Sequence, residues 1–235
     1  MLSPCWIFPH YGHFLTETLS RLHALERYPT SNVIFDVFDN HETRTLGKRW
    51  AQQLLAAVGL NNERILFSTE RRIFEKIIFP TQSLVLHRGV STQGQRKIWN
   101  RLEPLRSNST PNKKIYISRS RLEKNKRPLI NELEIEKSLT AYGFVIIYPE
   151  KMTVHEQIET FSQAELIIGP SGTALHNSVF MKEGTRIISL TTSDFTLINE
   201  ALCCYPRNQR YEVFFGVKDG NGWRVDIQEL LSCLF

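Results

Sequence analysis

The sequence predicts an α/β protein whose second half holds a parallel, doubly wound sheet, and three observations support this fold class. Between residues 115 and 190, four short apolar runs typical of buried strands alternate with segments of helical spacing. Within them, residues 165–190 follow the order strand, glycine turn, helix and strand, which is that of a βαβ unit. A polar linker at 107–112 precedes this regular pattern. We therefore expect two α/β lobes, residues 1–109 and 110–235.

In the first lobe, the clearest predicted element is a helix from His13 to about Arg27, because Leu15, Leu19 and Leu22 form an apolar stripe. The other elements predicted for this lobe are strands at 33–38, 65–67 and 73–79 and helices at 45–58 and 93–105.

Three polar residues on the opening helix, His13, Glu17 and Arg21, are spaced four residues apart and therefore share a face. Such spacing is common on solvated helices. From the spacing alone, an ordinary ion pair between Glu17 and Arg21 is favoured over a functional role.

The second lobe is predicted to alternate strands and helices. Its strands are expected at 115–118, 144–148, 166–168, 186–190 and 211–217, and its helices at 129–141, 153–163, 173–181 and 225–234. Thr153 and Glu156 have the spacing of a capping box at the start of the second of these helices. Residues 194–209 contain Pro206 and are predicted to be irregular.

The glycine turn that joins 166–168 to 173–181 is a candidate anion site. Backbone N–H groups at a helix start lack intrahelical partners, and the helix dipole favours a negative charge in front of them. Gly169 and Gly172 would let that backbone approach a ligand closely. The turn is neither the dinucleotide fingerprint nor a Walker loop, and an ordinary tight turn is an equal alternative.

Basic residues follow the first strand of the second lobe. In parallel sheets, ligands bind outside the carboxyl ends of the strands, where Arg119 and Arg121 fall. Arginine suits phosphate because its planar fork binds two oxygens at once. Arg119 directly follows a buried strand, whereas the lysines of 113–127 are interpreted as part of a solvated basic loop. No nucleic-acid-binding motif accompanies them, so no nucleic-acid partner is expected.

The composition is that of an ordinary globular protein. The chain has 235 residues, of which 41% are hydrophobic and 23% are charged. No apolar run approaches the roughly 20 residues of a membrane-spanning helix, and the first ten residues lack the pattern of a signal peptide. The four cysteines have no CxxC spacing, so we expect a reduced, cytoplasmic chain without structural zinc. The net charge of +5 suits an anionic ligand, a nucleic acid or an anionic membrane surface without choosing among them.

Four motifs stand in a recognisable order. They are Tyr-Gly-His-Phe-Leu-Thr-Glu at 11–17, Ile-Ser-Arg-Ser-Arg at 117–121 with Arg-Pro-Leu-Ile-Asn-Glu at 127–132, His-Glu-Gln at 155–157, and Ile-Ile-Gly-Pro-Ser-Gly-Thr-Ala-Leu-His-Asn at 167–177. In this order and spacing the chain resembles glycosyltransferase family 61 over residues 6–190. The family includes bacterial capsular-polysaccharide enzymes, and the chain resembles that type. The resemblance implies a GT-B fold of two Rossmann-like lobes facing a cleft, with a first lobe that is short or truncated here.

By matching position, the resemblance implies residue roles. The implied donor contacts are Arg119, Arg121, Gly169, Ser171, Gly172, Thr173, Ala174 and Asn177. Many family members carry histidine at the position of Ser171. On the acceptor side, Glu17 is expected to be the general base, and His13 to hold the acceptor or to orient Glu17.

The implied activity is inverting transfer of a sugar from a nucleotide-sugar donor to a glycan or glycolipid acceptor, in capsular or other cell-surface polysaccharide biosynthesis. No cofactor and no metal are expected, because arginine and a helix dipole can stabilise a leaving diphosphate. No clear Asp-x-Asp motif is found, and Asp36 and Asp39 are interpreted as a lobe boundary. The same expectation places the chain in the cytoplasm and allows peripheral association with the inner membrane.

Two alternatives of other kinds stay open. One is a non-catalytic or truncated paralogue that still binds a nucleotide or a glycan. The other is a polysaccharide pyruvyl-type transferase of similar two-domain architecture. Turnover separates the first from an enzyme. Release of a nucleoside diphosphate, as against inorganic phosphate from phosphoenolpyruvate, separates the second.

Overall fold

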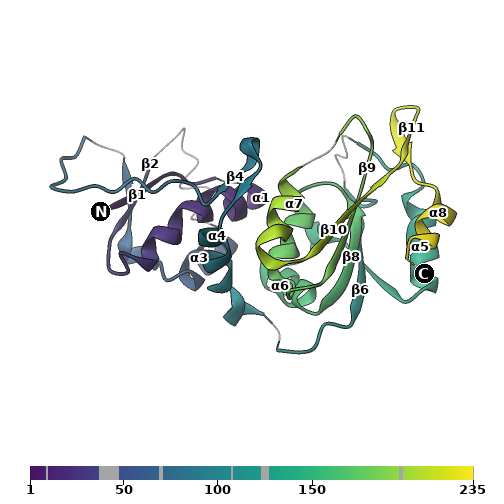
Figure 1. Cartoon of the computed structure of the whole chain (residues 1–235), viewed down its shortest axis with the longest axis horizontal. Coiled ribbons are helices and arrows are strands. Elements are labelled where there is room, and N and C mark those ends of the chain that lie inside the picture. Colours follow the sequence, from purple (N-terminus) through teal and green to yellow (C-terminus); the bar gives the residue numbers. More distant parts are fainter. Residues whose placement is uncertain are drawn as a thin grey trace. The chain divides into compact units, whose positions relative to one another are not determined.

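A computed structural model describes residues 1–8, 10–36, 48–68, 71–106, 108–122, 127–195 and 198–234 of the chain. The chain divides into two compact units, Met1–Arg106 and Ser107–Phe235 (Figure 1). Each unit has its own parallel sheet with helices packed around it. The predicted α/β class is therefore confirmed.

The sheet of the first unit has three parallel strands in the order β1-β2-β3. These are β1 (Leu2–Trp6), β2 (Val33–Asp36) and β3 (Ile65–Ser68). A separate antiparallel pair is formed by β4 (Leu84–Val85) and β5 (Val90–Ser91). Val33 and Phe35 are fully buried, as expected for a strand in a covered sheet.

The segment after β1 is helical, but its geometry changes along its length. It consists of α1 (Tyr11–His13), the π-helix η1 (Phe14–Thr18) and the 3₁₀-helix η2 (Leu19–Glu26). Leu15, Leu19 and Leu22 are all buried, so the predicted apolar stripe is confirmed. Short π-helical turns of this kind occur frequently at functional sites.

The other helices of the first unit are η3 (Asn62–Arg64), η4 (Leu86–Arg88) and η5 (Glu103–Leu105), all 3₁₀, and the α-helices α3 (Arg49–Ala57) and α4 (Gln93–Asn100). The predicted helix at 45–58 thus begins outside the described residues. The strand predicted at 73–79 is wrong. Ile73 is fully exposed there, and Ile78 makes a single bridge to Leu2. Glu75 and Lys76 interrupt the apolar residues of this segment, so it lacks the alternation that buries one face of a strand.

The second unit is built on five parallel strands in the order β10-β9-β8-β6-β7. The strands are β6 (Lys113–Ile117), β7 (Phe144–Ile147), β8 (Ala164–Pro170), β9 (Arg186–Thr191) and β10 (Arg210–Phe215). The chain runs from β6 to β7 at one edge and then crosses to β8 on the other side of β6. The gap between the ends of β6 and β8 is therefore the topological switch point, where ligands bind in such sheets.

Helices cover both faces of this sheet (Figure 1). On one face lie α5 (Glu132–Ala141) and α8 (Ile227–Ser232), which share a buried apolar cluster with the strands. On the other lie α6 (Val154–Ser162) and α7 (Ile198–Cys204), and the 3₁₀-helix η7 (Thr173–Phe180) packs against both of these helices. The predicted capping box at the start of α6 is confirmed, because the Thr153 and Glu156 side chains each bind the other's backbone N–H.

Three predictions for the second unit need correction. Strand β8 is not broken at Gly169 but continues to Pro170. Residues 194–209 are not irregular, because they contain α7 and the 3₁₀-helix η8 (Tyr205–Arg207). The predicted strand at 211–217 ends earlier and is followed by a hairpin of β11 (Val217–Asp219) and β12 (Gly222–Arg224). The remaining 3₁₀-helix is η6 (Pro149–Lys151).

Candidate functional site

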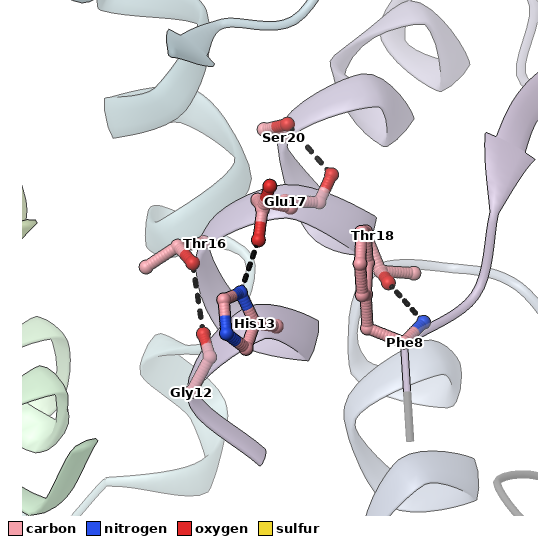
Figure 2. A network of polar contacts seen from close by, with 7 residues as sticks. All are labelled: Phe8, Gly12, His13, Thr16, Glu17, Thr18 and Ser20. Carbon is pink, nitrogen blue, oxygen red and sulfur yellow. Dashed lines mark hydrogen bonds and ion pairs between the residues drawn. The ribbon is translucent and has the colours of Figure 1, made fainter. Parts of the chain in front are cut away.

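In the first unit, the side chains of His13 and Glu17 are in hydrogen-bond contact on the helical segment after β1 (Figure 2). The contact joins His13 Nδ1 to Glu17 Oε2. The His13 side chain is 52% exposed, whereas that of Glu17 is only 16% exposed. The carboxylate thus lies behind the ring and holds it by one nitrogen, while the ring itself reaches solvent.

Side-chain hydrogen bonds to the backbone fix the turn that carries this pair (Figure 2). Thr16 Oγ1 donates to Gly12 O at 2.9 Å, and Ser20 Oγ donates to Glu17 O at 2.7 Å. Thr18 Oγ1 accepts a hydrogen bond from Phe8 N at 3.0 Å, which ties the π-helix to the segment after β1. These hydrogen bonds therefore restrain the backbone conformation of the turn that carries His13 and Glu17.

Glu17 does not form the ion pair with Arg21 that the residue spacing favoured. Arg21 turns away from it and donates from Nη1 to Pro80 O at 2.9 Å. On the other side, the His13 ring stacks on Phe8, with the ring centroids 5.5 Å apart. Of the two residues four positions from Glu17, His13 is the one that the structure places against its carboxylate.

In the second unit, a cavity of about 210 Å³ opens at the carboxyl ends of the strands, beside the switch point. It is lined by residues at or just after the carboxyl ends of β6, β8 and β9 and by the β11–β12 hairpin. These are Arg119, Arg127, Ser171, Leu190, Thr191, Thr192, Asp194, Phe195, Lys218, Asn221, Gly222 and Trp223. Three of them are cationic and one is acidic, so the cavity favours an anion.

Arg119 is held at the centre of the switch point by both its backbone and its side chain. Its N–H donates to Glu132 Oε1 at 2.8 Å, and its Nη1 donates to Ser171 O at 3.3 Å. Tyr116 also donates to Glu132 Oε1, at 3.3 Å. Burial lowers the pKa of Arg119, and the charge of Glu132 raises it in opposition. Arg119 thus joins the end of β6 to the turn after β8.

Arg127 is the second guanidinium of the cavity, and it lies on the face of Phe195, with its Cζ atom 3.3 Å from the ring centroid. Burial lowers its pKa, and the positive charge of Arg119 lowers it further. The two guanidinium groups therefore repel each other, and a bound anion would relieve that repulsion. Lys218, which is exposed on β11, supplies the third cation.

The turn between β8 and η7 is hydrogen-bonded to a buried carboxylate, whose role in this turn was not expected from the sequence. Glu200 on α7 is fully buried, and its Oε1 accepts from Ser171 Oγ at 2.8 Å and from Gly172 N at 2.7 Å. Its Oε2 accepts from Ser189 Oγ at 2.6 Å and from Tyr211 Oη at 2.9 Å. Because Gly172 N–H is already bound to Glu200, it is not a free anion donor in this structure.

The other expected donor contacts fall in different places. Arg121 stacks on Tyr148, with its Cζ atom 3.9 Å from the ring centroid, and does not line the cavity. Asn177 is buried, and its Nδ2 donates to Gln157 Oε1 at 2.9 Å. Thr173 and Ala174, at the start of η7, are also absent from the cavity lining.

Gly169 lies at a close contact between strands. A Cβ atom there would lie 2.8 Å from Ile117 Cβ, so only glycine lets β8 pack against the end of β6. Of the eight expected donor residues, Arg119 and Ser171 line the cavity, Gly172 lies in the turn beside it, and Gly169 lies within β8 at its contact with β6.

Sequence reasoning missed Lys218, Phe195, Trp223 and Glu200, and gave Arg127 no role beyond its place in the motif at 127–132. A signal for Lys218 was present, because Gly220 and Asn221, a dipeptide typical of two-residue hairpin turns, separate the two short strands of this hairpin. Gly220 has a φ of 54°, as the tight turn requires. Glu200 had no comparable signal, because its partners Ser171, Ser189 and Tyr211 are distant in sequence.

The described residues show neither a metal site nor a membrane-spanning helix. Within the described ranges, no group of three or more His, Cys, Asp and Glu side chains is placed to bind a metal ion. The pair Asp36 and Asp39 is not addressed by this, because Asp39 lies outside those ranges and only the backbone of Asp36 is described. In the part of the chain that the structure describes, no helix is long and apolar enough to cross a membrane.

A parallel α/β unit with a cationic cavity at its switch point is typical of proteins that bind phosphorylated ligands. Comparison with known families specifies this class further. The sequence model of the family described as Glycosyltransferase 61 matches residues 11–188, which is most of the chain. The chain therefore belongs to glycosyltransferase family 61. A comparison with curated proteins gave no match.

Proposed function

We propose that the protein is an inverting glycosyltransferase that moves a sugar from a nucleotide-sugar donor to a glycan or glycolipid acceptor, in capsular or other cell-surface polysaccharide biosynthesis. Family membership supports the transferase class. The observation that carries the donor assignment is the cavity where Arg119, Arg127 and Lys218 converge at the switch point. The two units, each with its own parallel sheet, correspond in this proposal to the two lobes of a GT-B enzyme.

The donor diphosphate is proposed to bind in the cavity of the second unit. Guanidinium groups bind two phosphate oxygens each, and fixed charges stabilise the negative charge that grows on a departing diphosphate. The cavity residues can supply this stabilisation as side-chain cations, so the proposal needs no divalent metal. We also expect the protein to lie in the cytoplasm, where nucleotide sugars are made.

The general base is proposed to be the His13–Glu17 pair acting as a unit. Inverting transfer needs one group that takes the proton of the acceptor hydroxyl while that oxygen attacks the anomeric carbon. When His13 Nδ1–H is bound by the carboxylate, Nε2 of the neutral ring is the nitrogen that can accept a proton. The more exposed position of the ring supports His13 as the acceptor of the proton, with Glu17 fixing its tautomer. The assignment from sequence gave these roles in the opposite order.

Turnover of two variants decides between the two orders. Nucleoside diphosphate release is measured at saturating donor for His13→Ala and Glu17→Gln. If His13 is the base, His13→Ala loses on the order of 10²–10⁴ in rate. Glu17→Gln then loses less, because the amide oxygen still accepts from Nδ1. If Glu17 is the base, the larger loss belongs to Glu17→Gln.

Glu26→Gln is the matched control, because Glu26 is an exposed acid on the same helical segment, where it pairs with Lys97. If both site variants retain more than about a tenth of wild-type turnover, the pair is only a surface ion pair. EDTA is added in a parallel assay. Turnover that is abolished by EDTA and restored by magnesium or manganese would contradict the metal-free leaving-group step.

The same assay addresses the two alternative activities. A paralogue without catalysis would bind a nucleoside diphosphate in the cavity but release none from any nucleotide sugar. A pyruvyl-type transferase would instead release inorganic phosphate from phosphoenolpyruvate. Each product is measured directly, so one set of reactions distinguishes the three.

A further inference from the structure

The β11–β12 hairpin forms one wall of the cavity, and it lies beyond residue 188, where the family match ends. Lys218 on β11 stands opposite Trp223 on β12. Trp223 is buried, and its Nε1 donates to Arg127 O at 3.3 Å. The hairpin that carries Lys218 is thus attached to the segment that carries Arg127.

Backbone contacts fix this attachment. Trp223 N donates to Pro128 O at 3.1 Å, and Ile130 N donates to Trp223 O at 2.8 Å. A Cβ atom on Gly222 would lie 2.4 Å from Pro128 O, so glycine is needed for the two backbones to approach this closely. The hairpin is therefore docked, and it holds the Cα atom of Lys218 at a fixed place beside the two arginines.

Cations outnumber acids among the residues that line the cavity, where Arg119, Arg127 and Lys218 face a single acid, Asp194. Glu132 and Glu200, which are not part of the lining, act on Arg119 and Arg127 respectively. Among the described residues, no carboxylate forms an ion pair with Lys218. Lysine binds phosphate as a compact point charge, whereas the arginine forks can hold two oxygens each. The third cation therefore adds a separate contact beyond what the two arginines provide.

The size of the cavity indicates which part of a ligand it holds. Its volume of about 210 Å³ is below the roughly 300–1,000 Å³ of sites that enclose a drug-sized molecule. A complete nucleotide sugar would extend beyond it. Given the surplus of positive charge, the part that fits the cavity is the diphosphate.

We propose that the β11–β12 hairpin is a phosphate clamp, in which Lys218 provides the contact that makes the cavity prefer a diphosphate over a single phosphate. The clamp rests on the proposed function, because it deepens the assignment of the donor diphosphate to this cavity. It adds a specificity-determining residue from outside the matched segment.

The test uses inorganic pyrophosphate and inorganic phosphate as probes, titrated by calorimetry into the full chain. Wild type is expected to bind pyrophosphate at least about tenfold more tightly than phosphate. Lys218→Gln should lose at least about tenfold in pyrophosphate affinity, as expected for one charge-assisted contact, and change little for phosphate. Lys218→Arg should retain the preference. Lys113→Gln is the matched control, because Lys113 is exposed at the amino end of β6, opposite the carboxyl ends that form the cavity.

The proposal is overturned if Lys218→Gln keeps the wild-type preference, if it weakens both probes equally, or if wild type binds neither probe. None of these outcomes depends on turnover. If wild type transfers no sugar but Lys218→Gln loses the preference for pyrophosphate, the clamp stands and the proposed function is wrong. If wild type transfers sugar but Lys218→Gln keeps the preference for pyrophosphate, the proposed function stands and the clamp is wrong.

Discussion

Among single residues, Glu200 shapes the turn beside the cavity without lining the cavity itself. Its two oxygens accept four hydrogen bonds, and the donors are Ser171 Oγ, Gly172 N, Ser189 Oγ and Tyr211 Oη. Glu200→Ala leaves the buried hydroxyls of Ser171 and Ser189 and the partly buried donors of Gly172 and Tyr211 without this acceptor. Each buried orphaned group costs about 1–3 kcal/mol, so the two buried hydroxyls alone give an expected loss of roughly 2–6 kcal/mol in the free energy of unfolding, measured by urea denaturation.

Glu200→Gln separates the loss of acceptors from the loss of charge. Its amide oxygen can still accept from Gly172 N and Ser171 Oγ, and the hydroxyls of Ser189 and Tyr211 can rotate to accept from its NH₂ group. We expect it to cost less than half of what Glu200→Ala costs. Equal stability of the two variants would show that the four hydrogen bonds do not hold the turn.

Residue spacing limited what the sequence could say about Glu17. His13 and Arg21 both stand four positions from it, so helical periodicity gives them equal access. The choice is made by Pro80, whose carbonyl binds Arg21 from a segment 59 positions away. Helical periodicity cannot indicate a contact between residues that are so far apart in the sequence.

Among the elements, β9 and β10 are joined by a charge contact between Arg186, the first residue of β9, and Glu212, the third residue of β10. Arg186 on β9 donates from Nε and Nη2 to the two oxygens of Glu212 on β10, at 2.8 and 2.7 Å. This hydrogen bonding by Arg186 lowers the pKa of Glu212 below its ordinary value and outweighs the effect of burial. The folded chain therefore binds a proton at Glu212 less readily than the unfolded chain does.

The pH dependence of stability follows from that sign. The contribution of Glu212 is present above the ordinary glutamate pKa of about 4.3, and it is lost as the pH falls through the lower pKa of the folded state. The pair is partly exposed, so we expect Glu212→Gln to cost only about 1 kcal/mol at pH 7. The difference in unfolding free energy between this variant and wild type should shrink as the pH falls below about 4.

Glu134→Gln is the control for this experiment, because Glu134 is exposed on α5 and forms no part of the β9–β10 pairing. It should be close to wild type at every pH. A Glu212→Gln deficit that stays constant from pH 7 down to about pH 3 would contradict an electrostatic origin.

Element prediction succeeded where local pattern decides the structure and failed where distant contacts do. The alternation from β6 to β9 and the capping box of α6 could be predicted, because apolar period and cap chemistry are local. Helix α7 was missed because Pro206 suggested an irregular segment, yet the proline follows the helix and lies in η8. A proline beyond the last turn ends a helix without preventing it.

In the whole molecule, the proposed chemistry is divided between two units. His13 and Glu17, proposed to act as the general base, lie in unit Met1–Arg106, and the cationic cavity lies in Ser107–Phe235. The sequence located the pair and Arg119 through motifs. The sequence did not identify the full cavity, because Arg127, Phe195 and Lys218 are far apart in the chain and come together only in the folded second unit.

The donor diphosphate is proposed to bind in the cavity of the second unit, and calorimetric titration tests this without turnover. Nucleoside diphosphates are titrated into wild type, Arg119→Ala and Glu17→Gln. Loss of one charged contact to phosphate costs about 1.5–3 kcal/mol, so Arg119→Ala should weaken binding at least about tenfold. Glu17→Gln, and the control Arg210→Ala at the amino end of β10, should bind like wild type. Unchanged affinity in Arg119→Ala, or no binding of any nucleoside diphosphate by wild type, would contradict the claim.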